Sequence, residues 1–136
     1  MLSTVLPLCH HPGMIPNRLS PYTYAALRIV FGFLWFIHGI QKYGALGDEP
    51  VELGSLRGVA GLIETVAGVL IMVGLFTRPA AFIASGQMAT AYFISHLPRA
   101  FWPIQNGGEP AVLFCFAFLY IASRGAGIWS LDARRA

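Results

Sequence analysis

The most constraining feature of this chain is an apolar run of nineteen residues, Gly58–Phe76, in which Glu64 is the only charged side chain. At a rise of about 1.5 Å per residue, a helix of that length matches the roughly 30 Å hydrocarbon core of a bilayer. A charged side chain at mid-membrane costs about 2.5–3.5 kcal/mol on insertion scales, so Glu64 needs a partner, a proton or a water-filled cavity. The run therefore predicts a membrane-spanning helix whose carboxylate is turned away from lipid.

The composition supports a membrane location for the whole chain. Only 11% of its 136 residues are charged and 56% are hydrophobic, and the mean hydropathy is +0.63. Soluble domains carry about 25% charged residues, which they need to solvate their surface. The formal net charge is +3, but the basic residues are scattered along the chain and flank apolar runs. This pattern indicates membrane topology and excludes nucleic-acid binding.

Three further apolar runs predict helices like the first. We expect an all-α, integral membrane four-helix bundle over residues 21–132, with an N-terminal tail at 1–20 and a C-terminal tail at 133–136. The short connection at Thr77 and Arg78 predicts that the helices on either side of it form an antiparallel hairpin. Recurring small residues, such as Gly61 and Gly68, predict close helix contacts. The additional predicted spans are Tyr22–Ile40, Pro79–Leu97 and Pro110–Gly127.

The basic residues also predict an orientation. With four spans both termini lie on one side, and that side collects six of the nine basic residues. The excess of Lys and Arg on cytoplasmic segments then places both termini in the cytoplasm. Arg28 and Arg124 are expected to extend to the inner headgroups. The terminal side holds Arg18, Arg28, Arg78, Arg124, Arg134 and Arg135, and the opposite side holds Lys42, Arg57 and Arg99.

Ionisable residues are expected to converge in the outer half of this bundle. His38 and Lys42 are four residues apart and so share a helix face. Glu64 lies about two turns from the outer end of the second span, which is the expected neighbour of the first. The other candidates near the outer ends are His96, Glu109 and Gln41. Two interpretations remain open, because the cluster either locks the packing of the helices or lines a pocket or proton path.

The sequence lacks the spacings that hold common cofactors. There is no Cys-x-x-Cys pair, no pair of histidines four residues apart and no Gly-rich phosphate loop. No metal site is predicted, and a redox role would need an organic cofactor or a partner subunit.

The motifs together resemble the DoxX family of small bacterial membrane proteins, over about residues 27–132. That resemblance implies a four-helix protein of the bacterial inner (plasma) membrane. The family name comes from a subunit of a thiosulfate:quinone oxidoreductase, and members are linked to oxidative-stress and thiol-homeostasis complexes. The matching positions include Arg28, His38-Gly39, Lys42, Gly61-x-x-Glu64, Gly74–Arg78, Phe101–Pro103, Gly107–Glu109 and Gly125-x-Gly127-x-x-Ser130–Asp132.

Three functions follow as alternatives. The first is a quinone-linked or thiol-linked redox component with an outward polar pocket, in which His38 and Glu64 handle protons and Lys42 stabilises negative charge. The second is a non-enzymatic scaffold or assembly factor for partner proteins. Transport of protons or small solutes is weaker, because the inner half of the bundle has few polar residues. The expected partners are the lipid bilayer and a membrane or redox protein, and a homo-oligomer is left open.

Overall fold

The computed structural model describes residues 16–135, so most of the predicted N-terminal tail and the last residue of the C-terminal tail lie outside the described residues. Within the described range the fold is helical, without strands. The elements are α1 (Ser20–Gln41), α2 (Leu56–Val73), α3 (Thr77–Ala91) continued by a π-helical segment (Tyr92–His96), the single turn α4 (Pro103–Asn106) and α5 (Glu109–Arg124), with 3₁₀ turns at Asn17–Leu19 and Asp132–Arg134.

Local sequence signals explain where the second helix begins and ends. The hydroxyl of Ser55 accepts a hydrogen bond from the Gly58 amide at 3.0 Å and so caps the start of α2. Gly74 ends the helix in the left-handed conformation, with φ 72°, which glycine adopts without strain. The helix therefore covers Leu56–Val73 and stops three residues before the end of the predicted apolar run.

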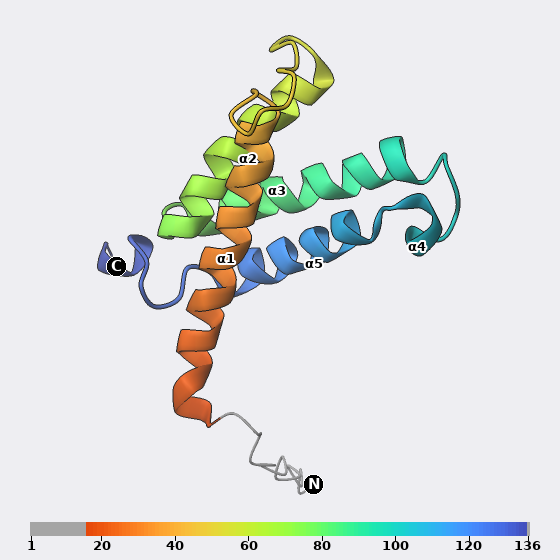
Figure 1. Cartoon of the computed structure of the whole chain (residues 1–136). Coiled ribbons are helices and arrows are strands. Elements are labelled where there is room, and N and C mark those ends of the chain that lie inside the picture. Colours follow the sequence, from red (N-terminus) through yellow and green to blue (C-terminus); the bar gives the residue numbers. More distant parts are fainter. Residues whose placement is uncertain (1–15, 136) are drawn as a thin grey trace, which may run out of the picture.

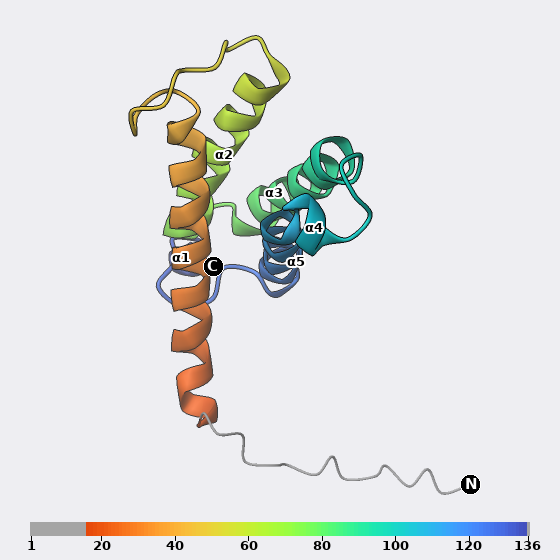
Figure 2. The ribbon, with the colours of Figure 1, turned by 45° about the vertical axis from the view of Figure 1, so that its right-hand side comes forward.

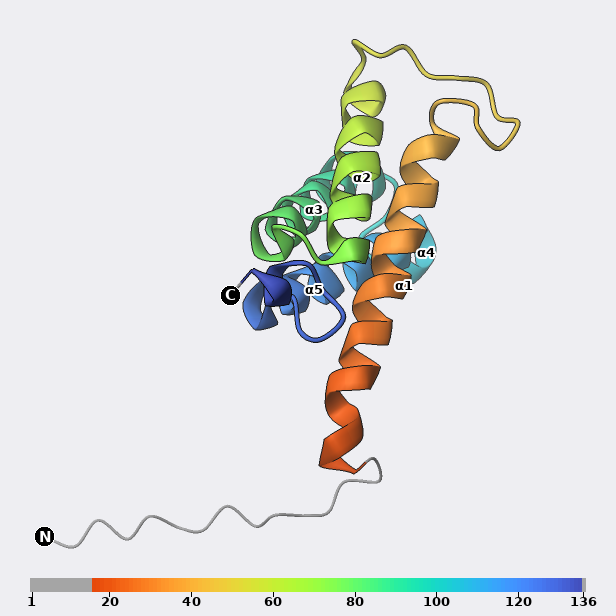
Figure 3. The same cartoon turned by 90° about the vertical axis from the view of Figure 1, so that its left-hand side faces the viewer.

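The helices pair as two hairpins, α1 with α2 and α3 with α5 (Figures 1 and 3). Glycines permit close approach of α1 and α2, because a Cβ at Gly32 would lie 2.6 Å from the Met72 amide nitrogen and one at Gly68 would lie 2.5 Å from that of Phe36. The tight turn between α2 and α3 is present, but α3 diverges from α2 with distance from that turn (Figure 2). The two hairpins thus form a fork.

Two helical stretches, Asn17–Gln41 and Leu56–Val73, are long and apolar enough to cross a membrane. The helices α3 and α5 have 15 and 16 residues, and the π-helical segment extends α3 to His96. These bounds overlap the predicted third and fourth spans.

Both hairpins meet in an apolar core at the closed end of the fork. Its fully buried side chains include Trp35 from α1, Ile71 from α2, Ala81 from α3, and Phe118 and Ile121 from α5. The hydroxyl of Ser85 on α3 donates a hydrogen bond of 2.9 Å to the Cys115 carbonyl of α5.

The prediction that Arg28 extends to the headgroups was wrong, because this side chain is completely buried. One guanidinium nitrogen donates to the Ile71 and Met72 carbonyls at 2.7 and 2.8 Å. The other donates to the Ile128 and Trp129 carbonyls at 3.3 and 2.8 Å. Carbonyls at the end of a helix have no partner within it. Arg28 supplies a partner for the Met72 carbonyl and a second donor for the Ile71 carbonyl, which also accepts from the Gly74 amide at 3.2 Å. It also holds the C-terminal segment against α2.

Candidate functional site

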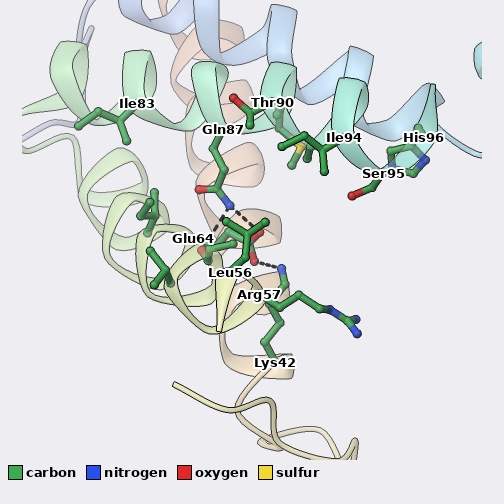
Figure 4. A pocket seen from close by; sticks show the side chains of 15 residues that line it. Lys42, Leu56, Arg57, Glu64, Ile83, Gln87, Thr90, Ile94, Ser95 and His96 are labelled. Carbon is green, nitrogen blue, oxygen red and sulfur yellow. Dashed lines mark hydrogen bonds and ion pairs between the residues drawn. The ribbon is translucent and has the colours of Figure 1, made fainter. Parts of the chain in front are cut away.

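Glu64 is buried on α2, at 3% exposure, and it contacts side chains from two other helices. The Lys42 ammonium, at the end of α1, forms an ion pair with Glu64 Oε2. The Gln87 amide, on α3, donates a hydrogen bond of 2.8 Å to Glu64 Oε1 and one of 3.3 Å to the Ala60 carbonyl. Figure 4 shows Gln87 extending from α3 toward this pair. The carboxylate thus has both partners that a buried charge requires.

A cavity of about 600 Å³ lies in the fork between α2 and α3, and we call it the fork pocket. Its wall on α2 is formed by residues between Leu56 and Glu64. The opposite wall is formed by residues of α3 from Ile83 onward and of the π-helical segment up to His96. Most of the exposed wall is apolar, and the hydrogen-bonded group Lys42–Glu64–Gln87 lies in it (Figure 4). Four further polar side chains also line it, from Arg57, Thr90, Ser95 and His96. Such a cavity suits an amphipathic small molecule.

Gln87 also presents an unused acceptor. Its amide nitrogen is committed to Glu64 and Ala60, whereas its Oε1 is buried without a hydrogen-bond partner among the described residues. A flipped amide would place this oxygen against two acceptors, so the orientation follows from the network. The polar group therefore contains ammonium donors on Lys42 and a buried, unpaired acceptor on Gln87.

The π-helical segment Tyr92–His96 forms the far part of the pocket wall, through Ile94, Ser95 and His96. His96 Nδ1 lies 3.1 Å from the Asn106 carbonyl oxygen, to which it donates, and its ring stacks on Tyr92. The Nε2 atom of a neutral His96 is then an acceptor. Short π-helical segments within α-helices often occur at functional sites.

His38 and Gln41 lie outside the fork pocket. They line a second, polar cavity of about 430 Å³ beneath the loop between α1 and α2, and Lys42 lines this cavity too. His38 is exposed, and its ring packs edge-on against Trp35 and Phe114. The i, i+4 spacing of His38 and Lys42 thus brings both to one cavity.

Glu109 is in neither cavity. It is exposed in the first turn of α5, and the structure gives it no hydrogen bond or ion pair within residues 16–135. A carboxylate at a helix N-terminus is stabilised by the helix dipole, which is sufficient reason for its position.

Gln87, whose amide forms an interhelical hydrogen bond to Glu64, was not among the site residues predicted from the sequence. A lone amide in an apolar run is the signal for such a bond, but the acceptor depends on how α3 crosses α2. Thr65, the neighbour of Glu64 in the sequence, donates within α2 to the Gly61 carbonyl at 2.8 Å.

The motifs near the α2–α3 turn, which include Asp132 and Arg78, make hydrogen bonds that hold helices together. The Asp132 carboxylate accepts hydrogen bonds of 2.9 Å from the Phe76 and Thr77 amides and from the Thr77 hydroxyl, and so caps α3. Partial burial raises the pKa of Asp132, but these hydrogen bonds lower it by a larger amount, so the net pKa is below its usual value. Arg78 donates to the Ser123 carbonyl at 3.0 Å near the end of α5. These contacts position the hairpins relative to each other.

Comparison with known proteins gives a family and three relatives. The DoxX family model matches residues 23–97. A Haemophilus influenzae protein of uncharacterised function is 44% identical, with coverage of 85% of this chain and 92% of that protein. An uncharacterised membrane protein of Mycobacterium tuberculosis is 25% identical, with coverage of 85% and 82%. CatD of Bacillus subtilis, named provisionally as an oxidoreductase, is 25% identical, with coverage of 78% and 81%. No solved structure matches the chain.

Proposed function

The chain belongs to the DoxX family of membrane proteins, and on that basis we propose that it is a redox component of the bacterial inner membrane that binds a quinone headgroup in the fork pocket. In this proposal α1, α2, α3 with its π-helical extension, and α5 form four spans of one bundle. The distribution of basic residues favours cytoplasmic termini and a fork that opens toward the outer side.

The single observation that carries the proposal is the polar group Lys42–Glu64–Gln87 in the wall of a pocket whose lining surface is mainly apolar. A quinone has an apolar ring and tail with two carbonyl oxygens. Lys42 can donate to such a carbonyl, and Gln87 Oε1, which is buried without a partner, can accept from the hydroxyl of the reduced form once the Gln87 side chain turns toward the pocket. The site therefore offers hydrogen bonds to both redox states.

The entrance also fits a lipid-soluble ligand. Residues Val59, Ile83 and Ile94 line the pocket and are about half exposed, at 48%, 54% and 56%. In a bilayer these side chains would face acyl chains. A quinone would thus enter from the membrane rather than from water.

Reduction of a quinone to its hydroquinone consumes two electrons and two protons. The electrons come from a partner redox protein in the membrane, and the protons pass through the Lys42–Glu64 pair to the quinone oxygens. The provisional name of CatD as an oxidoreductase supports a redox role. Glu64 is the proton-handling residue, and Gln87 is the positioning residue.

Binding of a radiolabelled short-chain ubiquinone to the purified protein in lipid nanodiscs tests the proposal. Glu64 holds both ligand-binding side chains, Lys42 and Gln87, so Glu64→Gln should misplace at least one of their hydrogen bonds to the quinone. A hydrogen bond to a charged group is worth about 1.5–3 kcal/mol, which corresponds to a loss of affinity of about 10-fold to 150-fold. Glu109→Gln is the matched control, because this carboxylate is exposed and lines neither cavity.

Equal affinity of the wild type and Glu64→Gln would refute the assigned role of Glu64. Absence of saturable binding to the wild type would refute the quinone site. If a detergent extract without quinone binding still gave a stoichiometric protein partner, the scaffold function would replace the redox function.

A further inference from the structure

The polar cavity beneath the α1–α2 loop has no assigned role so far. It occupies about 430 Å³, and polar or charged side chains provide most of its lining, including His38, Gln41, Asp48 and Glu49. The fork pocket, in contrast, is lined mainly by apolar side chains. The two cavities therefore suit different contents, water and ions in one and an apolar ring in the other.

Lys42 belongs to the lining of both cavities. The side chain of Lys42 is 23% exposed, whereas that of its partner Glu64 is 4% exposed. The ammonium thus extends from the polar cavity to a carboxylate that has almost no exposure of its own. Lys42 is the connection between Glu64 and the polar cavity.

The loop over this cavity is held in place by its own hydrogen bonds. The Val51 amide donates to the Lys42 carbonyl at 2.9 Å, and the Gly47 amide donates to the Gly44 carbonyl at 3.2 Å. Gly44 and Gly47 adopt φ values of 82° and 91°, which allow the tight turns. Asp48 and Glu49 are therefore positioned at the cavity by backbone structure.

We infer that the polar cavity is the aqueous port through which the Lys42–Glu64 pair exchanges protons with the solution on the side of the α1–α2 loop. His38, Asp48 and Glu49 relay the protons, because imidazole and carboxylate groups exchange protons readily with water. The inference deepens the proposed function, since it gives the proton transfer at the fork pocket a defined side of the membrane.

The polar cavity next to the ion pair is lined by four further titratable or charged side chains. His38 contributes from α1, Arg57 from α2, and Asp48 and Glu49 from the loop. On the α3 side, the polar side chains of the fork pocket include Gln87, which holds Glu64, and the more distant His96. The acidic groups that can relay a proton to Lys42–Glu64 thus lie on the polar-cavity side of the pair.

Reactivity of introduced cysteines with a membrane-impermeant, water-soluble methanethiosulfonate reagent tests the port. The background is the full chain with Cys9→Ser and Cys115→Ala, in right-side-out and inside-out vesicles. We expect Glu64→Cys to react only when the reagent is on the loop side. Val66→Cys, which is half exposed at the lipid-facing surface of the same helix, is the control and should not react.

Two further variants keep the test decisive if Glu64→Cys folds poorly. Gln87→Cys preserves the ion pair and should also react only from the loop side. Addition of Gln41→Trp, which fills the polar cavity, should slow the reaction of either cysteine. The port is refuted if both cysteines stay unreactive, if they react equally from both sides, or if Gln41→Trp has no effect. Because no quinone is needed, the port and the quinone site can fail separately.

Discussion

Lys42→Met should destabilise the protein more than Glu64→Gln, although both substitutions break the same ion pair. Removal of Lys42 leaves the carboxylate of Glu64 buried, at 4% side-chain exposure, without a counter-ion. Removal of the carboxylate leaves an ammonium that is 23% exposed and can turn into the polar cavity. The difference in exposure therefore predicts a difference in stability.

The magnitudes follow from the contacts. Breaking a buried pair costs about 3–5 kcal/mol when one charge is left uncompensated. Gln87 still donates its 2.8 Å hydrogen bond to Glu64 in the Lys42→Met variant, and such a bond to a charged group is worth about 1.5–3 kcal/mol. We therefore expect a loss of about 2–3 kcal/mol for Lys42→Met. Since Lys42 is partly solvated, Glu64→Gln should cost about 1 kcal/mol.

The assay is reversible unfolding in mixed micelles of increasing dodecyl sulfate content, followed by far-UV circular dichroism. The double variant Lys42→Met/Glu64→Leu should be more stable than Lys42→Met alone, because it removes both charges. Arg57→Met is the matched control, since this guanidinium is exposed. Equal losses for Lys42→Met and Glu64→Gln, or additive losses in the double variant, would refute the reasoning.

The same unfolding assay checks three predictions at the helix contacts. Arg28→Lys should cost about 3 kcal/mol or more, because a single ammonium cannot reach all four carbonyls that the guanidinium bonds. Each buried group left unpaired costs about 1–3 kcal/mol. A loss smaller than that of one hydrogen bond would contradict the role of Arg28 in joining α2 to the C-terminal segment. Gly68→Ala should cost about 1–3 kcal/mol from overpacking against Phe36, whereas Gly86→Ala, with nothing within 4 Å, should not destabilise; similar results for both contradict the close approach. Asp132→Ala should cost about 1 kcal/mol at pH 7 as a lost cap. Because the pKa of Asp132 is lowered on folding, the loss of stability in Asp132→Ala is fully present above pH 3.8 and shrinks as the pH falls through the lowered pKa. A loss of stability that does not change with pH would contradict the capping role.

The sequence predicted the features that depend on local pattern. A lone carboxylate in an apolar run had to be turned inward, and Glu64 is buried. The glycines of α2 predicted a close neighbour, and Gly61 and Gly68 do contact α1. The prediction ended α2 too late because the hydropathy of residues 74–76 stays high, whereas the backbone ends the helix at the left-handed Gly74.

Features that depend on distant parts of the chain were not predictable. From the sequence, Arg28 was predicted to lie at the membrane interface. Its burial could not be predicted, because its four carbonyl partners lie far away in the sequence, on α2 and in the C-terminal segment. The separation of His38 from the fork pocket depends on the path of the α1–α2 loop. The position of Glu109 outside both cavities depends on the divergence of the two hairpins.

Photoaffinity labelling with an azido-quinone in native membranes, followed by peptide mapping, tests the central claim most directly. The fork pocket predicts labels on α2 between Leu56 and Glu64, and on α3 and its π-helical extension between Ile83 and His96; competition by unlabelled ubiquinone should remove them. Labels confined to other surfaces, or labels that ubiquinone does not displace, would contradict a quinone site in the fork.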